Sequence, residues 1–161
     1  MQLTGKEIIE KGIITNHCDE GVQQQGVDVR LDRVFAVITG GKVPKVGKTR
    51  PAQTVEASPI YGTYCLTPGY YEVTFEEGCN IPNNATLHFK TRSSLVRCGA
   101  LVHSGQFDAG FHTDKAGAFL QVLMPIEIEK GARVAQALVF TSNEVENLYD
   151  GQWQGDKQRT K

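Results

Sequence analysis

Two kinds of reactive side chain stand close together in the middle of the sequence. The segment RSSLVR, residues 92–97, supplies hydroxyl and guanidinium groups, which donate hydrogen bonds to phosphate oxygens. Further along the chain, Asp108 lies in the stretch FDAGF and is the only acidic residue between Glu77 and Asp114. A carboxylate in such a place can take a proton from water. Phosphate donors beside a carboxylate therefore predict a site that binds or hydrolyses a phosphate ester.

Asp108 also has a purely structural interpretation, as an aspartate that caps the turn before Gly110. Its bulky apolar neighbour and the glycine predict a carboxylate that is partly buried and held in place. A second phosphate motif is excluded. The stretch GGKVPKVGKT resembles a P-loop, but its glycine is one residue too far from the GKT triplet, and Pro44 removes an amide donor. Spacing alone leaves both interpretations of Asp108 open.

Length and composition limit the classes of protein that could carry this site. The chain has 161 residues, 40% of them hydrophobic, so residues 1–161 fit one domain with a sizeable core. A net charge of −1 gives no electrostatic footprint for nucleic acid or for an anionic membrane. No apolar run approaches the ~20 residues of a membrane span, and MQLTGKEIIEKG is too charged for a signal peptide. We expect a cytoplasmic protein with neither nucleic acid nor membrane as a partner.

The cysteines and histidines do not form a recognisable metal or redox motif. None of the four cysteines, Cys18, Cys65, Cys79 and Cys98, has a partner at Cys-x-x-Cys spacing. The four histidines lack the i, i+4 pairing of a helical metal site. Isolated cysteines in a reducing cytosol are usually small buried hydrophobic residues, which is the interpretation adopted for all four.

Hydrophobic periodicity predicts one helix followed by many strands. Thr4 and Glu7 have the spacing of a capping box, and Gly12 ends the helix that they begin. Alternating or apolar segments predict strands over residues 27–31, 34–38, 70–75, 85–89, 118–124 and 133–140, with IEIEKGA as a further strand and turn. The polar residues 40–57 are expected to form a long loop. Many short strands at close spacing indicate an all-β barrel or sandwich with one short N-terminal helix.

Five segments of the sequence, in order, resemble the sequence blocks of the dUTP diphosphatase and dCTP deaminase superfamily. They are QQQGVDVRL with Asp28, RSSLVRCG, FDAGF, GARVAQ and, near the C-terminus, LYDGQWQGD. Together with LTGKEII they span nearly the whole chain. The last segment favours the deaminase-like branch, because typical dUTP diphosphatases end in a glycine-rich arginine motif that is absent here. The segments look closest to the archaeal-type dUTP diphosphatases, which combine deaminase-like architecture with hydrolase activity alone.

The resemblance implies a fold, an assembly and a set of ligands. The fold would be a distorted β-barrel of the dUTPase-like β-clip type, assembled as a homotrimer with active sites at subunit interfaces. The substrate would be a nucleoside triphosphate with Mg²⁺, which would be held mainly through the triphosphate and not by direct protein ligands. Residues 141–161 would form a tail that covers the substrate and excludes water. The alternative for this polar segment is a frayed terminus.

The resemblance also assigns roles to individual residues. Asp108 would be the catalytic carboxylate, and Asp28 would belong to a structural or metal-water network. The residues expected to bind substrate are Arg92, Ser93, Ser94, Arg97, Phe111, Gln121, Gln136, Tyr149, Trp153 and Gln154. Among these, Ser93 and Arg97 would hold phosphates. Phe111 would lie against the deoxyribose and leave no room for a ribose 2′-hydroxyl.

The choice between hydrolase and deaminase depends on Gln121. Deaminases of this superfamily carry a glutamate in a leucine-glutamate step on the strand after the third block, and here that step reads FLQV. Glutamine cannot exchange a proton at neutral pH, and the His-x-Glu and Pro-Cys-x-x-Cys elements of zinc deaminases are absent. The loop 112–117 is longer than usual, so the alignment of Gln121 has a gap beside it.

These observations together predict hydrolysis of dUTP to dUMP and pyrophosphate. Asp108 would activate the water that attacks the α-phosphorus, and Mg²⁺ would neutralise charge on the leaving pyrophosphate. Backbone groups of LVHSGQF would read the uracil. Two alternatives stay open. One is a dCTP deaminase or a bifunctional deaminase and dUTPase, and the other is a catalytically silent nucleotide-binding regulatory protein.

Overall fold

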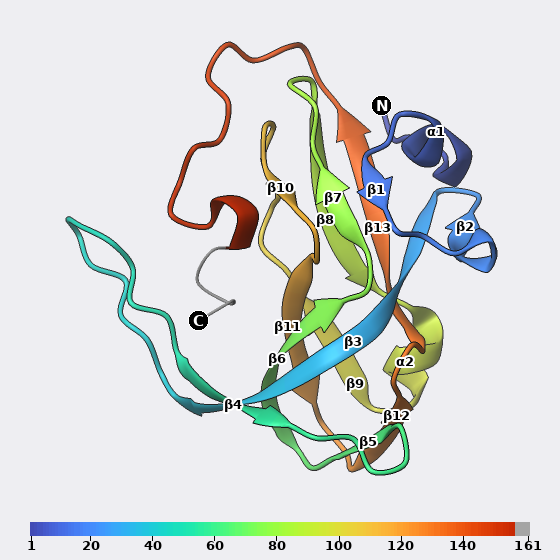
Figure 1. Cartoon of the computed structure of the whole chain (residues 1–161), viewed down its shortest axis with the longest axis vertical. Coiled ribbons are helices and arrows are strands. Elements are labelled where there is room, and N and C mark those ends of the chain that lie inside the picture. Colours follow the sequence, from blue (N-terminus) through green and yellow to red (C-terminus); the bar gives the residue numbers. More distant parts are fainter. Residues whose placement is uncertain (157–161) are drawn as a thin grey trace.

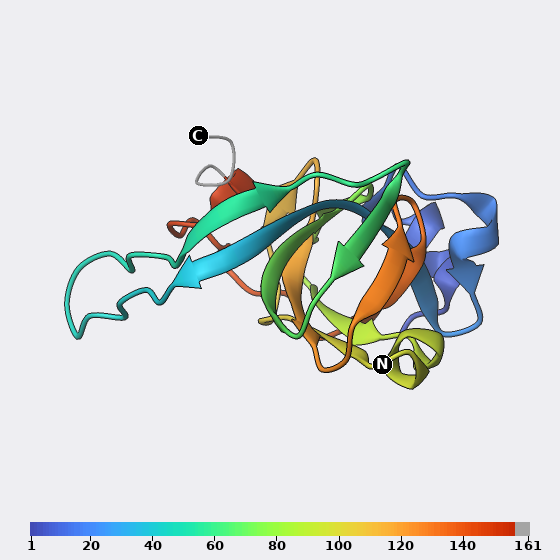
Figure 2. The same ribbon diagram turned by 90° about the horizontal axis from the view of Figure 1, so that it is seen from below.

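The main element of the fold is an eight-stranded sheet of antiparallel pairs that curls into a nearly closed barrel (Figures 1 and 2). The computed structural model describes residues 1–156. The strand order is β8-β13-β3-β6-β11-β9, and β2 and β4 also pair with β3. The strands are β2 (Val22–Gln23), β3 (Gly26–Thr39), β4 (Gln53–Ala57), β6 (Gly69–Phe75), β8 (Ala85–Thr91), β9 (Ala100–His103), β11 (Gly117–Val122) and β13 (Arg133–Thr141). The predicted mainly-β distorted barrel is confirmed.

The two ends of this sheet, β8 and β9, meet through side chains. The hydroxyl of Thr91 donates to the carbonyl of Val102 at 3.1 Å and accepts from its amide at 2.8 Å. The amide of Phe89 donates to the hydroxyl of Ser104 at 3.1 Å. These bonds nearly close the barrel, and they fix the start of the segment that leads to Asp108.

Two smaller sheets flank the barrel. One has the order β1-β7-β10, formed by β1 (Ile14–Thr15), β7 (Gly78–Asn80) and β10 (His112–Thr113). The other pairs β5 (Thr63–Leu66) with β12 (Ile126–Glu129). The described residues also form two short 3₁₀ turns, η1 (Asp19–Gly21) and η2 (Gln154–Asp156).

The N-terminal helix α1 (Gly5–Glu10) forms as predicted. The amide of Glu7 donates to the hydroxyl of Thr4 at 3.3 Å, and the amide of Thr4 donates to the Glu7 carboxylate at 2.8 Å. Gly12 follows with a φ of +64°, which ends the helix at little cost for a glycine. The prediction of a single helix is wrong, because α2 (Ser93–Arg97) lies between β8 and β9. Within residues 1–156, no helix has the length and apolar character needed to cross a bilayer.

Residues 27–31 and 34–38 were predicted as separate strands, but they belong to one strand of 14 residues, β3. The charged residues Asp32 and Arg33 interrupt the apolar pattern there. Asp32 is nevertheless only 5% exposed, because Lys115 and Lys130 pair with its carboxylate. The register with β6 shifts beside Asp32, as expected for a bulge. Partners from distant segments thus keep the strand continuous where its own sequence suggests a break.

Beyond Thr39 the chain projects from the barrel as a long hairpin (Figures 1 and 2). We call residues 40–52 the arm. Lys42 and Arg50 exchange both backbone hydrogen bonds, at 2.8 and 3.0 Å. The loop predicted over residues 40–57 is therefore wrong for residues 53–57, which return to the sheet as strand β4.

The barrel interior holds the hydrophobic core, with Phe75, Leu31, Leu87 and Leu120 among its largest fully buried side chains. All four cysteines are free thiols. Burial was predicted for all of them and holds for Cys79, while Cys18 is half-buried.

The prediction of buried cysteines is wrong for Cys65 and Cys98, which are exposed. Cys65 takes an outward position in the alternating strand β5, and Cys98 follows the exposed end of α2. The exposure of these thiols therefore depends on their positions in the strand and at the helix end, and not on the general preference of cysteine for burial.

Candidate active site

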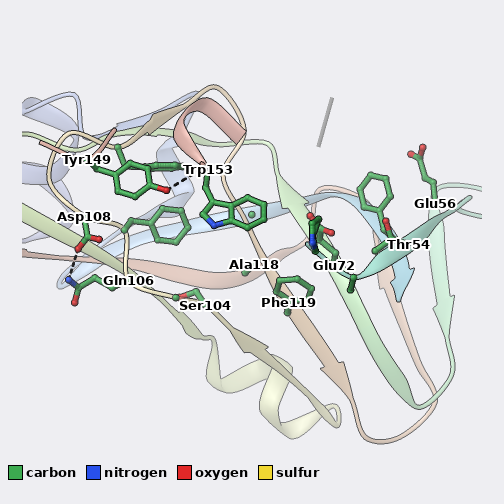
Figure 3. A pocket seen from close by; sticks show the side chains of 17 residues that line it. Thr54, Glu56, Glu72, Ser104, Gln106, Asp108, Ala118, Phe119, Tyr149 and Trp153 are labelled. Atoms are coloured by element: carbon green, nitrogen blue, oxygen red, sulfur yellow. Dashed lines mark hydrogen bonds between the residues drawn. The ribbon is translucent and has the colours of Figure 1, made fainter. Parts of the chain in front are cut away.

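A cavity of about 750 Å³ lies between the barrel sheet, the arm and the C-terminal tail (Figure 3). The segment before and at Asp108 forms one wall, and strands β3, β4, β6 and β11 form the floor. The lining residues are Phe35, Pro51, Ala52, Thr54, Glu56, Glu72, Ser104, Gly105, Gln106, Phe107, Asp108, Phe111, Gly117, Ala118, Phe119, Tyr149 and Trp153. A space of this size and shape suits a small organic ligand.

The floor of the cavity is a row of acidic and aromatic side chains that crosses four strands. Strand register places Glu56 opposite Phe35 and Phe35 opposite Glu72. Glu72 in turn lies opposite Phe119. Directly opposed residues of antiparallel strands project from the same face of the sheet, so these four side chains form one surface. Arg33 binds Glu56 with hydrogen bonds of 2.7 and 2.6 Å, which leaves the aromatic rings as the apolar part of the floor.

Asp108 stands at the rim of the cavity. Its side chain is exposed and accepts a hydrogen bond from Nε2 of Gln106 at 2.7 Å. The prediction of a partly buried carboxylate is wrong for the single chain, because the segment has left the sheet after β9 and its residues 105–106 are exposed as well. The carboxylate does not cap the turn. The backbone closes that turn, through the amide of Phe111 and the carbonyl of Asp108 at 3.1 Å. An exposed carboxylate held by one amide can accept a proton from water.

Phe111 is buried behind Asp108, under the C-terminal tail. Its ring meets the rings of Phe107 and Tyr149 edge-on, with centroids 5.3 and 5.7 Å away. The tail approaches so closely that a Cβ on Gly110 would lie 2.6 Å from the Cβ of Leu148. Gly110 also has a φ of +87°, so both its conformation and its lack of a side chain are needed for this contact.

Gln154 fastens the end of the tail. Its Nε2 donates to the carbonyls of Gly110 and Tyr149 at 2.8 and 2.9 Å, and its Oε1 accepts from the amide of His112 at 3.0 Å. Trp153 is 37% exposed, and its ring lies over the cavity (Figure 3). Residues 149–154 of the tail are therefore held against the barrel and not frayed, and residues 157–161 of the predicted tail lie outside the described part of the chain.

The charge of the cavity restricts what can bind there. Among the described residues that line it, the acidic side chains are those of Glu56, Glu72 and Asp108, and none is a lysine, an arginine or a histidine. Like charges repel, so this lining does not favour a triphosphate. An uncharged nucleoside with an aromatic base fits the aromatic floor. The lining of this cavity therefore suits an uncharged aromatic group better than a phosphate.

A second, smaller cleft of about 240 Å³ has the opposite character. It is lined by Gln23, Asp28, Lys90, Thr91, Arg92, Ser93 and Gln136. Nε of Arg92 lies 3.0 Å from the carboxylate of Asp28, and Nε2 of Gln136 donates to it at 3.2 Å. Burial raises the pKa of Asp28, which is 1% exposed, and the positive charge of Arg92 offsets that effect only in part. The buried acid thus holds cationic and amide side chains in place.

Most of the predicted phosphate-binding residues lie at or near this second cleft. Arg92 and Ser93 line it, and Gln136 reaches it from β13. Ser94 and Arg97 are exposed on α2, outside both the cavity and the cleft. The structure thus brings Asp108, Phe111, Tyr149, Trp153 and Gln154 together around the cavity, while the predicted phosphate donors gather elsewhere on the same chain.

Most of the chain matches a known protein family. Residues 3–142 match the family described as dCTP deaminase-like. The chain belongs to the dCTP deaminase-like family. This membership confirms the superfamily that the five sequence segments predicted.

Relatives with similar sequences are named as deoxyuridine 5′-triphosphate nucleotidohydrolases. A relative from Halobacterium salinarum, named probable deoxyuridine 5′-triphosphate nucleotidohydrolase, is 33% identical over 148 residues, 89% of this chain and 88% of its own. A relative from Methanocaldococcus jannaschii, named deoxyuridine 5′-triphosphate nucleotidohydrolase, is 29% identical over 148 residues, 90% of this chain and 94% of its own. Both are archaeal, in agreement with the predicted subgroup.

The crystal structure of a 2′-deoxycytidine 5′-triphosphate deaminase from Agrobacterium tumefaciens superimposes with a TM-score of 0.62. It is 19% identical, and the match covers 86% of this chain but only 47% of the deaminase chain. At that identity the likeness establishes a shared fold and nothing about the reaction.

Gln121, placed at the family's deaminase glutamate position from sequence, lies outside the cavity. Its Oε1 is 2.9 Å from Nε2 of His103. The part of β11 that lines the cavity consists of Gly117, Ala118 and Phe119, none of which can carry a proton. Among the described residues, β11 therefore offers the cavity no group for a deaminase proton shuttle.

Sequence reasoning missed Glu72, Gln152 and the arm residues Pro51 and Ala52. The alternation in YYEVTF would have placed Glu72 on the face opposite to Val73, but not over a cavity. Nothing in the sequence indicated that the arm returns beside the tail, since Gln152 and Thr49 are 103 residues apart.

The predicted Mg²⁺ was tested against the donor groups that the protein offers. Within residues 1–156, no cluster of three or more histidine, cysteine, aspartate or glutamate side chains could hold a metal ion. Mg²⁺ prefers several oxygen ligands and is often bound through substrate phosphates with only one or two carboxylates. The residues present are therefore compatible with a magnesium ion that arrives with a triphosphate.

Proposed function

We propose that this chain is a dUTP diphosphatase that hydrolyses dUTP to dUMP and pyrophosphate. The names and the 29–33% identity of the archaeal relatives support this assignment. The observation that carries it is Asp108, an exposed carboxylate held by Gln106 at the rim of a nucleoside-sized cavity. Within the cavity, no described group on β11 replaces the proton shuttle that deamination needs.

In the proposed reaction, Asp108 accepts a proton from a water molecule. The oxygen of that water forms a bond to the α-phosphorus, and the bond from the α-phosphorus to the oxygen bridging to the β-phosphate breaks. The electron pair leaves with pyrophosphate. Magnesium bound to the triphosphate supplies neutralisation of the charge on the phosphates. The amide of Gln106 keeps the carboxylate of Asp108 oriented before the proton transfer.

The cavity residues bind the nucleoside in this proposal. Phe111 lies behind the sugar, while Tyr149 and Trp153 cover it. Backbone groups of residues 104–107 contact the edge of the uracil, where an amide faces O4 and a carbonyl faces N3–H. Cytosine presents the reverse order of donor and acceptor at these positions and binds less well.

The phosphates are held by cationic and hydroxyl side chains from another subunit in a homotrimer. Arg92, Ser93, Ser94, Arg97 and Gln136 supply these groups. The lining of the cavity supports this arrangement, because the described residues that line it include no lysine or arginine, whereas phosphates are held best by cationic donors. Light scattering at working concentration is expected to give the mass of a trimer, and an active monomer would contradict the shared site.

The test of the reaction is incubation of the protein with dUTP and with dCTP separately, in the presence of Mg²⁺, with pyrophosphate and ammonia measured in each. We expect pyrophosphate from dUTP and no ammonia from dCTP. Ammonia from dCTP would support the deaminase alternative. Binding of either nucleotide without any product would support the regulatory alternative. The reaction is placed in the cytoplasm, together with the other reactions of nucleotide metabolism.

A further inference from the structure

The side chain of Gln152 joins the C-terminal tail to the arm. Its Nε2 donates to the carbonyl of Thr49 at 2.7 Å, and its Oε1 accepts from the amide of Thr49 at 3.0 Å. Both bonds are partly buried. The side-chain amide therefore pairs with the arm backbone as a neighbouring strand would. We call this pair of hydrogen bonds the latch.

The latch lies where the arm and the tail, which both line the cavity, meet each other. The arm contributes Pro51 and Ala52 to the lining of the cavity, and the tail contributes Tyr149 and Trp153. The amide of Trp153 donates to the hydroxyl of Tyr149 at 3.1 Å, so the two tail aromatics are linked to each other. Gln152 does not line the cavity itself, but it precedes one of these aromatics directly in the chain.

The arm and the tail also carry opposite charges. Residues 40–50 contain four cationic side chains and no acidic one, namely Lys42, Lys45, Lys48 and Arg50. Residues 142–155 contain Glu144, Glu146 and Asp150 and no cationic side chain. Such a pattern favours approach of the two segments, most strongly at low ionic strength. The charges attract the segments in general, and the latch fixes which residues meet.

We propose that Gln152 is a positioning residue: it holds the tail against the arm so that Tyr149 and Trp153 cover the nucleoside. In this account the arm is the fixed support for the tail. The catalytic consequence rests on the proposed hydrolysis of dUTP, whereas the latch exists without substrate. Glutamine suits the position because one amide supplies both a donor and an acceptor. Alanine supplies neither group.

The position of the tail can be measured directly, because Trp153 is the only tryptophan in the chain. In the Gln152→Ala variant without nucleotide, we expect stronger quenching of its fluorescence by acrylamide than in the unaltered protein. Gln53→Ala is the matched control, since Gln53 is exposed at the start of β4 and does not take part in the latch. Unchanged quenching in Gln152→Ala would overturn the proposal.

The same variant tests the consequence for catalysis. Loss of two partly exposed hydrogen bonds corresponds to a decrease of about tenfold in kcat/KM for dUTP, mostly through a higher KM. Gln53→Ala is expected to keep the kinetics of the unaltered protein. A Gln152→Ala variant that opens the tail but retains full kcat/KM would contradict the covering role of the latched tail.

A double-variant cycle separates the latch from direct contact between Gln152 and the substrate. Replacing residues 42–50 by an Asn-Gly hairpin turn removes Thr49 and leaves the barrel strands in place. In that background, Gln152→Ala is expected to cause no further change in quenching or in kcat/KM. An undiminished effect of Gln152→Ala there would show that Gln152 acts without the arm, which overturns the proposal.

Two further measurements keep the result interpretable. If the shortened arm prevents folding, Thr49→Pro removes the amide donor without changing the length of the arm. In that background the effect of Gln152→Ala is expected to be smaller than in the unaltered protein but not absent, because the carbonyl of residue 49 can still accept from Gln152, and an undiminished effect would overturn the proposal. If no variant and no unaltered protein hydrolyses dUTP, the proposed function fails. The quenching comparison still decides the latch in that case, because it needs neither substrate nor turnover.

Discussion

Two aspartates mark the two clefts of this barrel, and their surroundings are opposite. Asp108 is exposed, and its described hydrogen bond comes from one neutral amide, that of Gln106. Asp28 is buried against the guanidinium groups of Arg92 and Arg133. The first carboxylate is open to a water molecule, whereas the second is occupied with holding cationic side chains. The same residue type is therefore proposed to serve chemistry in one cleft, whereas in the other it holds cationic side chains in place.

The difference also concerns the sign of charge that each cleft presents. The large cavity has carboxylates and aromatic rings but no cation among the described residues that line it. The small cleft contains Lys90 and Arg92 and is too small for a nucleoside triphosphate. Neither cleft alone suits dUTP, but together they supply what its two halves need. The comparison thus favours a site that two copies of the chain share, as proposed for the trimer.

The largest effect is expected at Asp108. Asp108→Asn keeps the shape and the capacity to hydrogen-bond but removes the general base, so turnover of dUTP should fall by about 10²-fold or more. Binding of dUTP, measured by calorimetry, should persist. Asp114→Asn is the matched control, since Asp114 is exposed on the neighbouring loop. Near-normal turnover of Asp108→Asn would falsify the catalytic role.

Removal of the tail tests whether its contacts affect activity without affecting the folding of the barrel. Truncation after Asn147 deletes Tyr149, Trp153 and Gln154 but leaves β13, which ends at Thr141. We expect kcat/KM for dUTP to fall about tenfold or more, because the nucleoside is no longer covered. Circular dichroism and denaturant unfolding should show a folded barrel. A truncated protein as active as the full chain would exclude a role for the tail.

The two buried aspartates of β3, Asp28 and Asp32, allow a pH test of how each carboxylate contributes to stability. Burial raises the pKa of Asp28, so its contribution to stability is present below the ordinary value of 3.8 and is lost as the pH rises through the raised pKa. For Asp32, burial alone would raise the pKa, but Lys115 and Lys130 lower it overall. Its contribution is present above 3.8 and is lost as the pH falls through the lowered pKa.

Replacement of each aspartate by asparagine should therefore have different consequences. At pH 7, Asp32→Asn should lower the free energy of unfolding by about 1.5–3 kcal/mol, as for a lost hydrogen bond to a charged group. Asp28→Asn should change it by less than about 1 kcal/mol, because the cost of burying the charge offsets its pairing. Urea unfolding at several pH values checks both. Equal losses in the two variants would contradict this distinction.

The smallest effect is expected at Gln121. Because Gln121 contacts His103 outside the cavity, Gln121→Glu should leave dUTP hydrolysis within about twofold of the unaltered protein. It should release no ammonia from dCTP, since a carboxylate at this place does not face the nucleoside. Measurable ammonia from the variant would mean that Gln121 lies closer to the base in the active assembly than in the single chain.

The sequence predicted those parts of the fold that depend on neighbouring residues. The capping box of Thr4 and Glu7 forms locally, and YYEVTF alternates because one face of β6 meets the core. The continuity of β3 was not predictable, because Asp32 becomes acceptable in a strand only when two distant lysines pair with it. The helix α2 has only five residues, too few to produce a periodic pattern.

The candidate site was predictable in its residue types but not in its grouping. The resemblance indicated Asp108, Phe111 and the tail aromatics, and the structure places them around one cavity. The exposure of Asp108 depends on where the chain leaves the sheet, which local sequence does not specify. The contact of Gln152 with Thr49 joins segments that are distant in sequence, and no local pattern encodes it.

The most direct test of the shared site is a mixture of two inactive variants. Asp108→Asn removes the base from its own cavity, and Arg97→Ala removes a phosphate donor. The two are unfolded together, refolded as mixed trimers, and assayed for pyrophosphate release from dUTP. If each site combines the cavity of one chain with the donors of another, about a quarter of the sites are complete and a corresponding activity returns. A mixture that is as inactive as its two parents would contradict a site shared between chains.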